Sequence, residues 1–195
     1  MSHGVTVSLG LAEAHRHDAA RLYLDAFGRK LGPILGTGDR AEAFLAKVLN
    51  LSQAISATED GALIGLAGFH DENGGLMGGG FRDFVAVYGW PGAAWRTPAL
   101  ALFEREPKPD QLLMDGVVVA QAARGRGVGA RLLDAVEAHA TALGRSAIRL
   151  DVVDTNPRAR ALYVRKGFDP VGKQRMGPLA PIFGFSYSET MVKAI

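Results

Sequence analysis

A glycine-rich turn is the first feature of this sequence whose residue types and spacing could do chemistry. It reads Gln121-Ala-Ala-Arg124-Gly125-Arg126-Gly127-Val128-Gly129-Ala130 and joins a hydrophobic stretch to an amphipathic segment. Glycines at every second position let the backbone approach a ligand closely and adopt positive φ. Unpaired amides at the start of a helix carry about half a positive charge, so with the arginines they make an anion site. We expect a pyrophosphate group to bind there.

Several kinds of glycine-rich turn compete for this interpretation. A P-loop is disfavoured because no Lys-Ser/Thr pair follows the last glycine. A dinucleotide site is partly matched, since Gly125-x-Gly127-x-x-Ala130 fits G-x-G-x-x-A and Asp151 or Asp154 follows. The chain that remains is too short for a doubly wound sheet, and antiparallel hairpins are expected before the turn. The turn could also be a solvated connection between strand and helix that binds no ligand, and this interpretation stays open.

Arg124-x-x-Gly127-x-Gly129 after a hydrophobic strand resembles the [Gln/Arg]-x-x-Gly-x-[Gly/Ala] signature of the GNAT acetyltransferase superfamily. The downstream block Leu150-Asp151-Val152-x-x-x-Asn156-x-x-Ala159-x-x-Leu162-Tyr163-x-x-x-Gly167-Phe168 is similar to that superfamily's strand–helix–strand segment. Two motifs in the right order are more specific than either alone. The resemblance covers about 111–172 strongly and 1–70 only by pattern, and 71–110 looks like an insertion.

The resemblance implies that the pyrophosphate belongs to coenzyme A. The strand at Val117, Val118 and Val119 is expected to splay from the next strand, so that its backbone pairs with the pantetheine arm as an added strand would. The Val119 amide would then face the thioester carbonyl. The implied cofactor-binding residues are Val117, Val118, Val119, Arg124, Gly125, Arg126, Gly127, Val128, Gly129, Ala130 and Asn156. For Asn156 the alternative is a helix N-cap.

The resemblance also implies two residues that move protons. Tyr163 stands where GNAT proteins place a tyrosine that protonates the departing sulfur, although core packing is its alternative role. Asp151 stands where the similar ribosomal-protein N-terminal acetyltransferases carry a glutamate base. A role in the core does not easily explain it, because burying an unpaired carboxylate in an apolar strand costs free energy. Aspartate is shorter than glutamate, so a water relay or Asp115 stays open as the base.

The function implied is acetyl transfer from acetyl-coenzyme A to a primary amine, by direct attack in a ternary complex. The acceptor class, a small molecule or a peptide, is left open by the sequence. The alternatives are a coenzyme A-binding regulatory module without catalysis and, less favoured, a dinucleotide-dependent oxidoreductase. Homodimerisation is a further expectation of the resemblance and of the aromatic residues in 71–110.

These residues must be positioned by strands and helices, which the hydrophobic periodicity predicts. Strands are expected at 5–9, 54–58, 62–69, 112–120, 147–153, 168–173 and 185–192, and helices at 12–31, 40–49, 126–143 and 156–166. Asp39 and Asn156 are the expected N-caps, and Gly144 is the expected helix stop. Only a helical tendency at 97–106 is readable in 71–110. The predicted fold is α+β, a mixed, mostly antiparallel sheet of about six to seven strands flanked by about four helices.

Composition bounds the remaining possibilities. The 195 residues predict one domain over 1–195, with no cysteine for disulfides, thiolate metal sites or nucleophiles. The five histidines are scattered, so no metal site is expected. No membrane segment is expected either, because the longest apolar stretch, about 61–69, is much shorter than the roughly 18 residues that a membrane helix needs. No signal peptide is readable, and a cytoplasmic location is expected.

Charge and glycine are distributed unevenly along the chain. The net charge of +2 predicts no nucleic-acid partner, yet residues 121–175 hold 11 basic and 5 acidic residues, so the remainder is −4. Glycine is about 13% of the chain, against a usual 7%. Seven of the 25 glycines fall between Gly74 and Gly92, outside the proposed phosphate turn.

Overall fold

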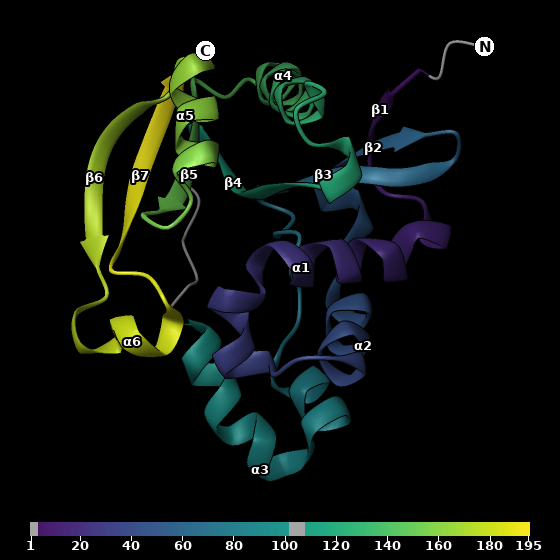
Figure 1. The fold of residues 1–195 in the computed structure, drawn as a ribbon, viewed down its shortest axis with the longest axis vertical. Helices are drawn as coiled ribbons and strands as arrows, with labels where there is room; N and C mark the ends of the chain where they lie inside the picture. The colour runs from purple at the N-terminus through teal and green to yellow at the C-terminus, as the bar shows by residue number, and fades with distance from the viewer. Residues whose placement is uncertain (1–3, 102–107) are drawn as a thin grey trace.

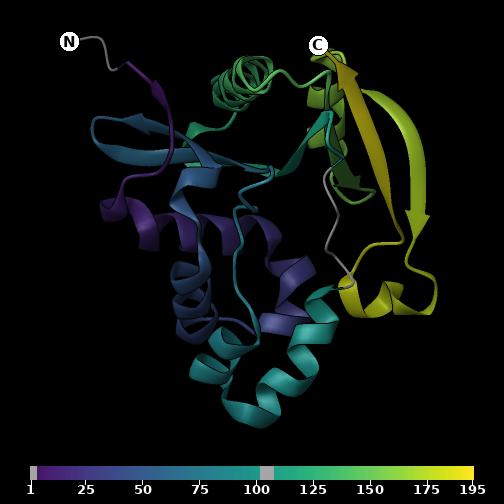
Figure 2. The same cartoon turned by 180° about the vertical axis from the view of Figure 1, so that it is seen from behind.

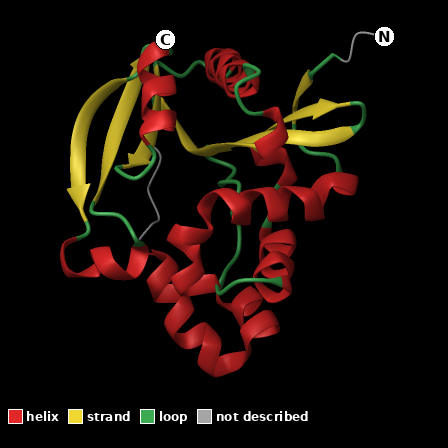
Figure 3. Ribbon diagram, in the orientation of Figure 1, coloured by secondary structure: helices red, strands yellow, loops and turns green. Residues whose placement is uncertain are grey.

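The computed structural model describes residues 4–101 and 108–195, and one seven-stranded sheet runs through it. The strands are β1 (Thr6–Leu9), β2 (Ala54–Glu59), β3 (Ala62–His70), β4 (Gln111–Val119), β5 (Ala147–Val153), β6 (Asp169–Arg175) and β7 (Tyr187–Ala194). Their order is β1-β2-β3-β4-β5-β7-β6, and β4 with β5 is the parallel pair among antiparallel ones. The mixed, mostly antiparallel α+β fold predicted from the sequence is confirmed (Figure 3).

Helices cover both faces of the sheet. They are α1 (Arg16–Leu35), α2 (Asp39–Val48), α3 (Phe81–Ala101), α4 (Val128–Ala142), α5 (Pro157–Arg165) and α6 (Ala180–Phe183), with 3₁₀ turns at Glu13–His15, Leu51–Gln53, Gln121–Ala123 and Gly177–Leu179. Helices α4 and α5 lie over one face, and α1, α2 and α3 gather on the other (Figures 1 and 2). The four expected helices are α1, α2, α4 and α5. Helix α3 and the short α6 are additional.

The sheet separates two hydrophobic cores. One lies among α1, α2 and α3 and includes Phe44 and Phe84, and the other lies under α4 and α5 and includes Leu132 and Tyr163. Successive strand residues point to opposite faces, so each central strand contributes to both cores. The layered packing fixes the strand ends between the two sets of helices, where the candidate site lies.

Local sequence signals explain several element boundaries. Asp60 (φ 50°) and Gly61 (φ 80°) make a tight turn between β2 and β3, of the kind that hairpins with two-residue loops use. Helix α4 ends at Ala142, and Gly144 (φ 68°) stops it just after the cap residue, with the Arg145 amide returning to the Ala140 carbonyl at 3.0 Å. The predicted hairpin and the predicted glycine stop are both confirmed.

The helix predictions differ from the structure mainly at their ends. Helix α1 continues to Leu35, past Gly32 and Pro33, because its buried side chains continue to Ile34 and Leu35. The predicted N-cap Asp39 is wrong by one position: Gly38 is the capping residue, Asp39 is the first residue of α2, and no side chain in the described part of the chain caps this helix. Helix α4 begins at Val128, two residues later than predicted.

Residues 71–101, the described part of the segment that the sequence predicts to be an insertion and that is called the insertion below, pack against the rest of the chain. The first part of the insertion crosses to the sheet, where the Leu76 amide donates to Asp115 Oδ2 at 2.9 Å and the Leu76 carbonyl accepts from the Asn50 amide at 2.8 Å. Helix α3 follows, kinked at Gly89 (φ 70°, ψ 172°). The predicted helical tendency at 97–106 is met up to Ala101, and residues 102–107 lie outside the described part of the chain.

Candidate active site

The centre of the sheet opens between β4 and β5. Their parallel pairing runs only from Gln111↔Ala147 to Met114↔Leu150, although β4 continues to Val119 and β5 to Val153. Beyond this point, among the described residues, β4 pairs only with β3, and β5 pairs only with β7. In Figure 1 the strands β5, β6 and β7 turn away from β1 to β4. Two facing strand edges are therefore available to a ligand.

A bulge in β4 sits at the start of this opening. Gly116 pairs with Gly68 but Met114 pairs with Phe69, so Asp115 is an extra residue on β4. A Cβ on Gly116 would lie 2.6 Å from Phe27 Cζ, so the close approach of α1 requires glycine there. The bulge shifts the side-chain alternation of β4: before it Met114 faces the α4 core, and after it Val117 and Val119 do.

The register determines which backbone groups face the opening. The Ala120 amide donates to the Ile64 carbonyl at 2.9 Å, and antiparallel pairing alternates, so Val118 also bonds to β3. The amides and carbonyls of Val117 and Val119 therefore point toward the opening. Arg124 Nε donates to the Val119 carbonyl at 3.0 Å, which leaves the Val119 amide directed at the gap. This is the splayed edge that the resemblance implied.

The turn from β4 to α4 presents a group of backbone amides. Gly125 (φ 77°) and Gly127 (φ 80°, ψ 0°) adopt the left-handed conformation that glycine tolerates. The first intrahelical bond is from the Arg131 amide to the Gly127 carbonyl, at 3.1 Å. Within the described chain the amides of 128–130 have no backbone acceptor and no side-chain cap. Their arrangement at a helix start fits a phosphate group.

The arginines of this turn are engaged within the protein. Arg126 forms an ion pair with Glu59, and that carboxylate raises the pKa of the guanidinium. Arg131 Nη2 donates to the Val5 carbonyl at 2.6 Å. Gly129 lies close to α5, since a Cβ there would be 3.2 Å from Leu162 Cδ2. The backbone of the turn is therefore the part that can bind an anion, and these arginines lie at its rim.

Helix α5 carries two of the predicted site residues. The Asn156 side chain accepts a hydrogen bond from the Ala159 amide at 3.1 Å, and Pro157 stands at the first helical position, so the N-cap interpretation is confirmed. Tyr163 is buried and its ring lies 5.8 Å from that of Phe168. Burial raises the pKa of the Tyr163 phenol to about 12. No described residue hydrogen-bonds the Tyr163 hydroxyl, and its oxygen is not fully enclosed.

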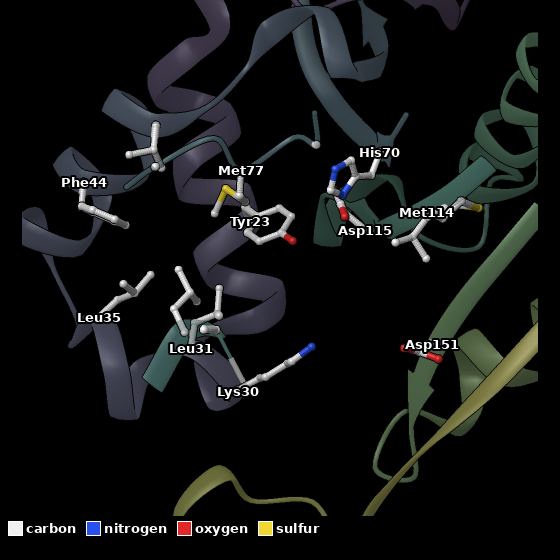
Figure 4. Close-up of a pocket in the computed structure, with 16 residues that line it drawn as sticks. Tyr23, Lys30, Leu31, Leu35, Phe44, His70, Met77, Met114, Asp115 and Asp151 are labelled. Atoms are coloured by element: carbon white, nitrogen blue, oxygen red, sulfur yellow. The ribbon is translucent and has the colours of Figure 1, made fainter. Parts of the chain in front are cut away.

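A cavity of about 650 Å³ lies on the opposite face, between the sheet and helices α1, α2 and α3 (Figure 4). Asp115 and Asp151 both line it, and they directly follow Met114 and Leu150, the last residues that pair β4 with β5. Thr190 Oγ1 donates to Asp151 Oδ1 at 2.5 Å. Burial raises the pKa of Asp115, while the Leu76 amide and nearby His70 and Lys30 act in the opposite direction.

The three predicted catalytic residues fall on two sides of the opening. Asp151 faces the cavity, whereas Tyr163 and Val119 pack in or against the α4–α5 core. Tyr23, Lys30 and His70 also line the cavity and were missed by the sequence analysis. Tyr23 stands in the apolar phase of α1, four residues before Phe27, so its pattern is that of a core residue. No local signal marks Lys30 or His70.

A mixed sheet that opens between two parallel strands, followed by a helix start whose amides have no described acceptor, is the architecture that the sequence resemblance implied. The model of the Acetyltransferase (GNAT) family matches residues 21–168, so this chain belongs to the GNAT acetyltransferases. That family uses acetyl-coenzyme A and catalyses acetyl transfer.

Solved structures with the same fold agree. An N-acetyltransferase from Staphylococcus aureus Mu50 is 16% identical, with a TM-score of 0.70 over 96% of this chain and 99% of that one. A GCN5-related N-acetyltransferase from Kribbella flavida is 21% identical, with a TM-score of 0.61 over 98% of each chain. The protein yncA from Salmonella typhimurium, whose structure holds its cofactor acetyl-CoA, is 15% identical, with a TM-score of 0.62 over 97% and 93%.

The described residues contain neither a membrane-spanning helix nor a cluster of metal ligands. None of their helices is both long and apolar enough to cross a membrane. None of their His, Asp and Glu side chains form a group of three that could hold a metal ion. The cytoplasmic location expected from the sequence stays a prediction.

Proposed function

We propose that this chain is an acetyl-coenzyme A-dependent N-acetyltransferase, acting as one catalytic domain that transfers the acetyl group directly to a primary amine. The observation that supports this most is the position of the opening. On one face it continues into the free amides of the β4–α4 turn, and on the other it leads to a cavity lined by two carboxylates. A cofactor and an acceptor can therefore reach the same gap from opposite faces.

The cofactor supplies an activated acetyl group as a thioester and leaves as a thiol. The amides of 128–130, with Gly125 and Gly127 shaping the turn, would hold its pyrophosphate. The Val117 and Val119 backbone would pair with the pantetheine arm, with Val118 fixing the strand on β3. Arg124 and Arg126 stand at the rim of this path, and Asn156 begins the helix beside it.

The Val119 amide would stabilise the negative charge that develops on the thioester oxygen, because it is held toward the gap by the register of β4. Tyr163 keeps its proton across the neutral pH range, since its pKa is about 12, and it would give that proton to the leaving sulfur. The attacking nitrogen gives up its second proton to water as the thiol leaves, and water returns a proton to the Tyr163 phenolate, so the protons balance.

Asp151 would take the proton that the acceptor ammonium must lose before it attacks. Thr190 donates to Asp151 Oδ1 and so fixes the orientation of the carboxylate. Asp115, at the corresponding place on β4, is the second carboxylate within the cavity and the alternative base. Attack from the cavity side and protonation from the α5 side match direct transfer, in which no acyl-enzyme forms.

Ligand-induced stabilisation and thiol release together test this function. Coenzyme A at about 100 times its Kd stabilises a protein by about 2.7 kcal/mol, a rise in Tm of roughly 5–10 °C for this length. NAD at the same concentration is expected to give no rise. Acetyl-coenzyme A with a panel of primary amines should release free thiol. Binding of coenzyme A without turnover of any amine would favour a regulatory module, and stabilisation by NAD alone would favour an oxidoreductase.

A further inference from the structure

The cavity beneath the opening is divided by chemistry. Its charged and polar lining groups belong mainly to the strand side, where Leu113 and Met114 also lie, and its other apolar groups belong to the helices and the insertion. In Figure 4 Asp115, His70 and Asp151 lie on the sheet side, while Leu31, Leu35, Phe44 and Met77 lie on the helix side. The ring of Tyr23 lies between the two halves, with its hydroxyl turned toward the sheet side.

The helix side offers an apolar wall. Leu31, Leu35 and Phe44 are buried, and Met77 and Leu100 complete this half from the insertion. The Leu35 carbonyl, at the end of α1, is already satisfied because the Tyr88 hydroxyl donates to it at 2.7 Å. A ligand group placed here meets hydrocarbon, and a polar group would lose its hydration without a partner.

The sheet side suits an amine. Asp115 and Asp151 supply two carboxylates, and Lys30 reaches the same half, so these three described side chains carry a formal balance of one negative charge when both carboxylates are ionised. An amino group beside these carboxylates also lies at the point where β4 and β5 part, which is where the acetyl group must be delivered. The polar half therefore holds the reacting group, and the apolar half holds whatever carries it.

The insertion limits the size of the cavity. Phe84 of α3 stacks on Phe44 with ring centroids 4.3 Å apart, which holds the far wall in the core. Gly79 runs close to α2, since a Cβ on it would lie 2.5 Å from Val48 Cγ1. The insertion therefore cannot approach α2 more closely at this point, and Gly79 has no room for a larger side chain. A volume of about 650 Å³ is in the range of pockets for small organic molecules.

We propose that the acceptor is a small primary amine with an apolar body, of the alkylamine or arylalkylamine class, bound with its amino group at Asp115 and Asp151. The hydrocarbon part occupies the space bounded by Leu31, Leu35 and Phe44. This inference rests on the proposed acetyl transfer and specifies its substrate class. Polyamines, amino sugars and peptides place polar groups or charges in the apolar half and are disfavoured.

A graded series of amines tests the class directly. Thiol release is measured with propylamine, butylamine, hexylamine and phenethylamine, and with spermidine, glucosamine and a tripeptide. We expect kcat/KM to rise about threefold to fourfold per added methylene through the alkyl series, as burial of hydrocarbon predicts. Hexylamine and phenethylamine should exceed the polar amines at least tenfold. A polar amine that exceeds both would overturn the inference and leave the transferase proposal intact.

Two matched variants locate the effect. Leu100→Trp fills the apolar half from α3, so it should lower kcat/KM for hexylamine at least tenfold while propylamine stays within about threefold. Leu143→Trp, at an exposed position after α4, should change neither value. The coenzyme A-induced rise in Tm reports folding of both variants. Equal losses for both amines in Leu100→Trp would contradict the assignment of this wall.

Equilibrium binding separates this inference from the proposed activity. Calorimetric titration of hexylamine and of spermidine into the coenzyme A-bound protein measures acceptor affinity without chemistry. Hexylamine should bind at least tenfold more tightly than spermidine, and Leu100→Trp should abolish that difference. If no amine is acetylated but this order holds, the transferase proposal fails and the cavity assignment stands. If the order is reversed, the cavity assignment fails whatever the activity.

Discussion

At the scale of single residues, the buried phenol of Tyr163 is the group whose chemistry is easiest to isolate. Tyr163→Phe removes only the hydroxyl, which bonds to no described residue, so the fold should be unaffected. We expect kcat to fall by about 10²-fold or more, the usual contribution of a proton donor, with the coenzyme A Kd within about threefold. Steady-state kinetics and coenzyme A titration measure the two effects.

The control for this variant is Tyr187→Phe, on β7, where Lys173 Nζ lies over the ring at 4.8 Å from its centroid. It should leave kcat within about twofold. Because the pKa of Tyr163 is about 12, kcat should also show no loss from its ionisation between pH 7 and pH 10. Parallel losses of kcat and cofactor affinity in Tyr163→Phe would indicate a packing role instead of a proton donor.

Asp115 is held in the folded protein at a cost that depends on pH. Burial raises the pKa of this carboxyl, so the native state binds the proton more tightly than the unfolded chain does. Stability contributed by the protonated form is present below the unfolded pKa, about 3.9, and is lost as pH rises through the folded pKa. At neutral pH the ionised group therefore destabilises the fold.

Asp115→Asn should accordingly raise the urea midpoint at pH 7, since an amide oxygen can still accept from the Leu76 amide. The gain should disappear near pH 3.5, and kcat/KM should fall because the cavity loses a carboxylate. Asp169→Asn on the exposed strand β6 is the matched control and should alter stability by less than about 0.5 kcal/mol at both pH values. A destabilised Asp115→Asn at pH 7 would show that the hydrogen bond outweighs the burial of charge.

At the scale of elements, the turn before α4 depends on backbone conformation more than on side chains. Gly127 has φ 80°, and nothing lies within 4 Å of a Cβ placed on it, so Gly127→Ala tests conformation without a clash. We expect a loss of about 1–2 kcal/mol in unfolding free energy and a coenzyme A Kd raised several-fold, because the amides of 128–130 shift. Chemical denaturation and cofactor titration measure these effects.

Gly172→Ala is the comparison, since this glycine also has open space around it but an ordinary φ. It should be neutral or slightly stabilising because alanine restricts the unfolded chain. If both variants lose the same stability, the left-handed conformation at Gly127 is not what the turn needs.

The elements differ in how far sequence alone could predict them. Asn156-Pro157 and Gly144 are local signals, and the structure uses them as a cap and as a stop. Helix α3 escaped prediction because Gly89, Pro91, Gly92 and Pro98 resemble a loop. In the folded chain Gly89 forms the kink between two helical segments. Tertiary packing against α2 overrides the weak propensity of this segment.

At the scale of the whole molecule, the site arises from relations between distant segments. Periodicity predicts β4 and β5 as strands, but the point where their pairing stops follows from the Asp115 bulge and from packing on both faces. Only the family resemblance implied the opening. The cavity joins Tyr23, His70 and Asp151, which no local pattern connects, so its chemistry could not be predicted from the sequence.

The role of the insertion depends on how it packs against the rest of the molecule. Substitution of Phe84 tests whether the insertion is a fixed wall of the cavity or a movable lid. Phe84 is 1% exposed and stacks on Phe44, whereas Trp90, on the same helix, is 69% exposed. Phe84→Ala should cost about 3–5 kcal/mol of unfolding free energy, because it leaves a cavity in the α1–α3 core. Trp90→Ala should cost less than about 1 kcal/mol.

Urea unfolding of the two variants, with hexylamine kinetics on each, separates the alternatives. A fixed wall predicts that Phe84→Ala also raises the KM for hexylamine, since Phe44 lines the apolar half and loses its support. Trp90→Ala should leave that KM unchanged. If Phe84→Ala costs less than about 1 kcal/mol and KM is unaltered, α3 is not held by the core. The acceptor cavity would then be bounded by a segment free to open, and its size would no longer select a small apolar amine.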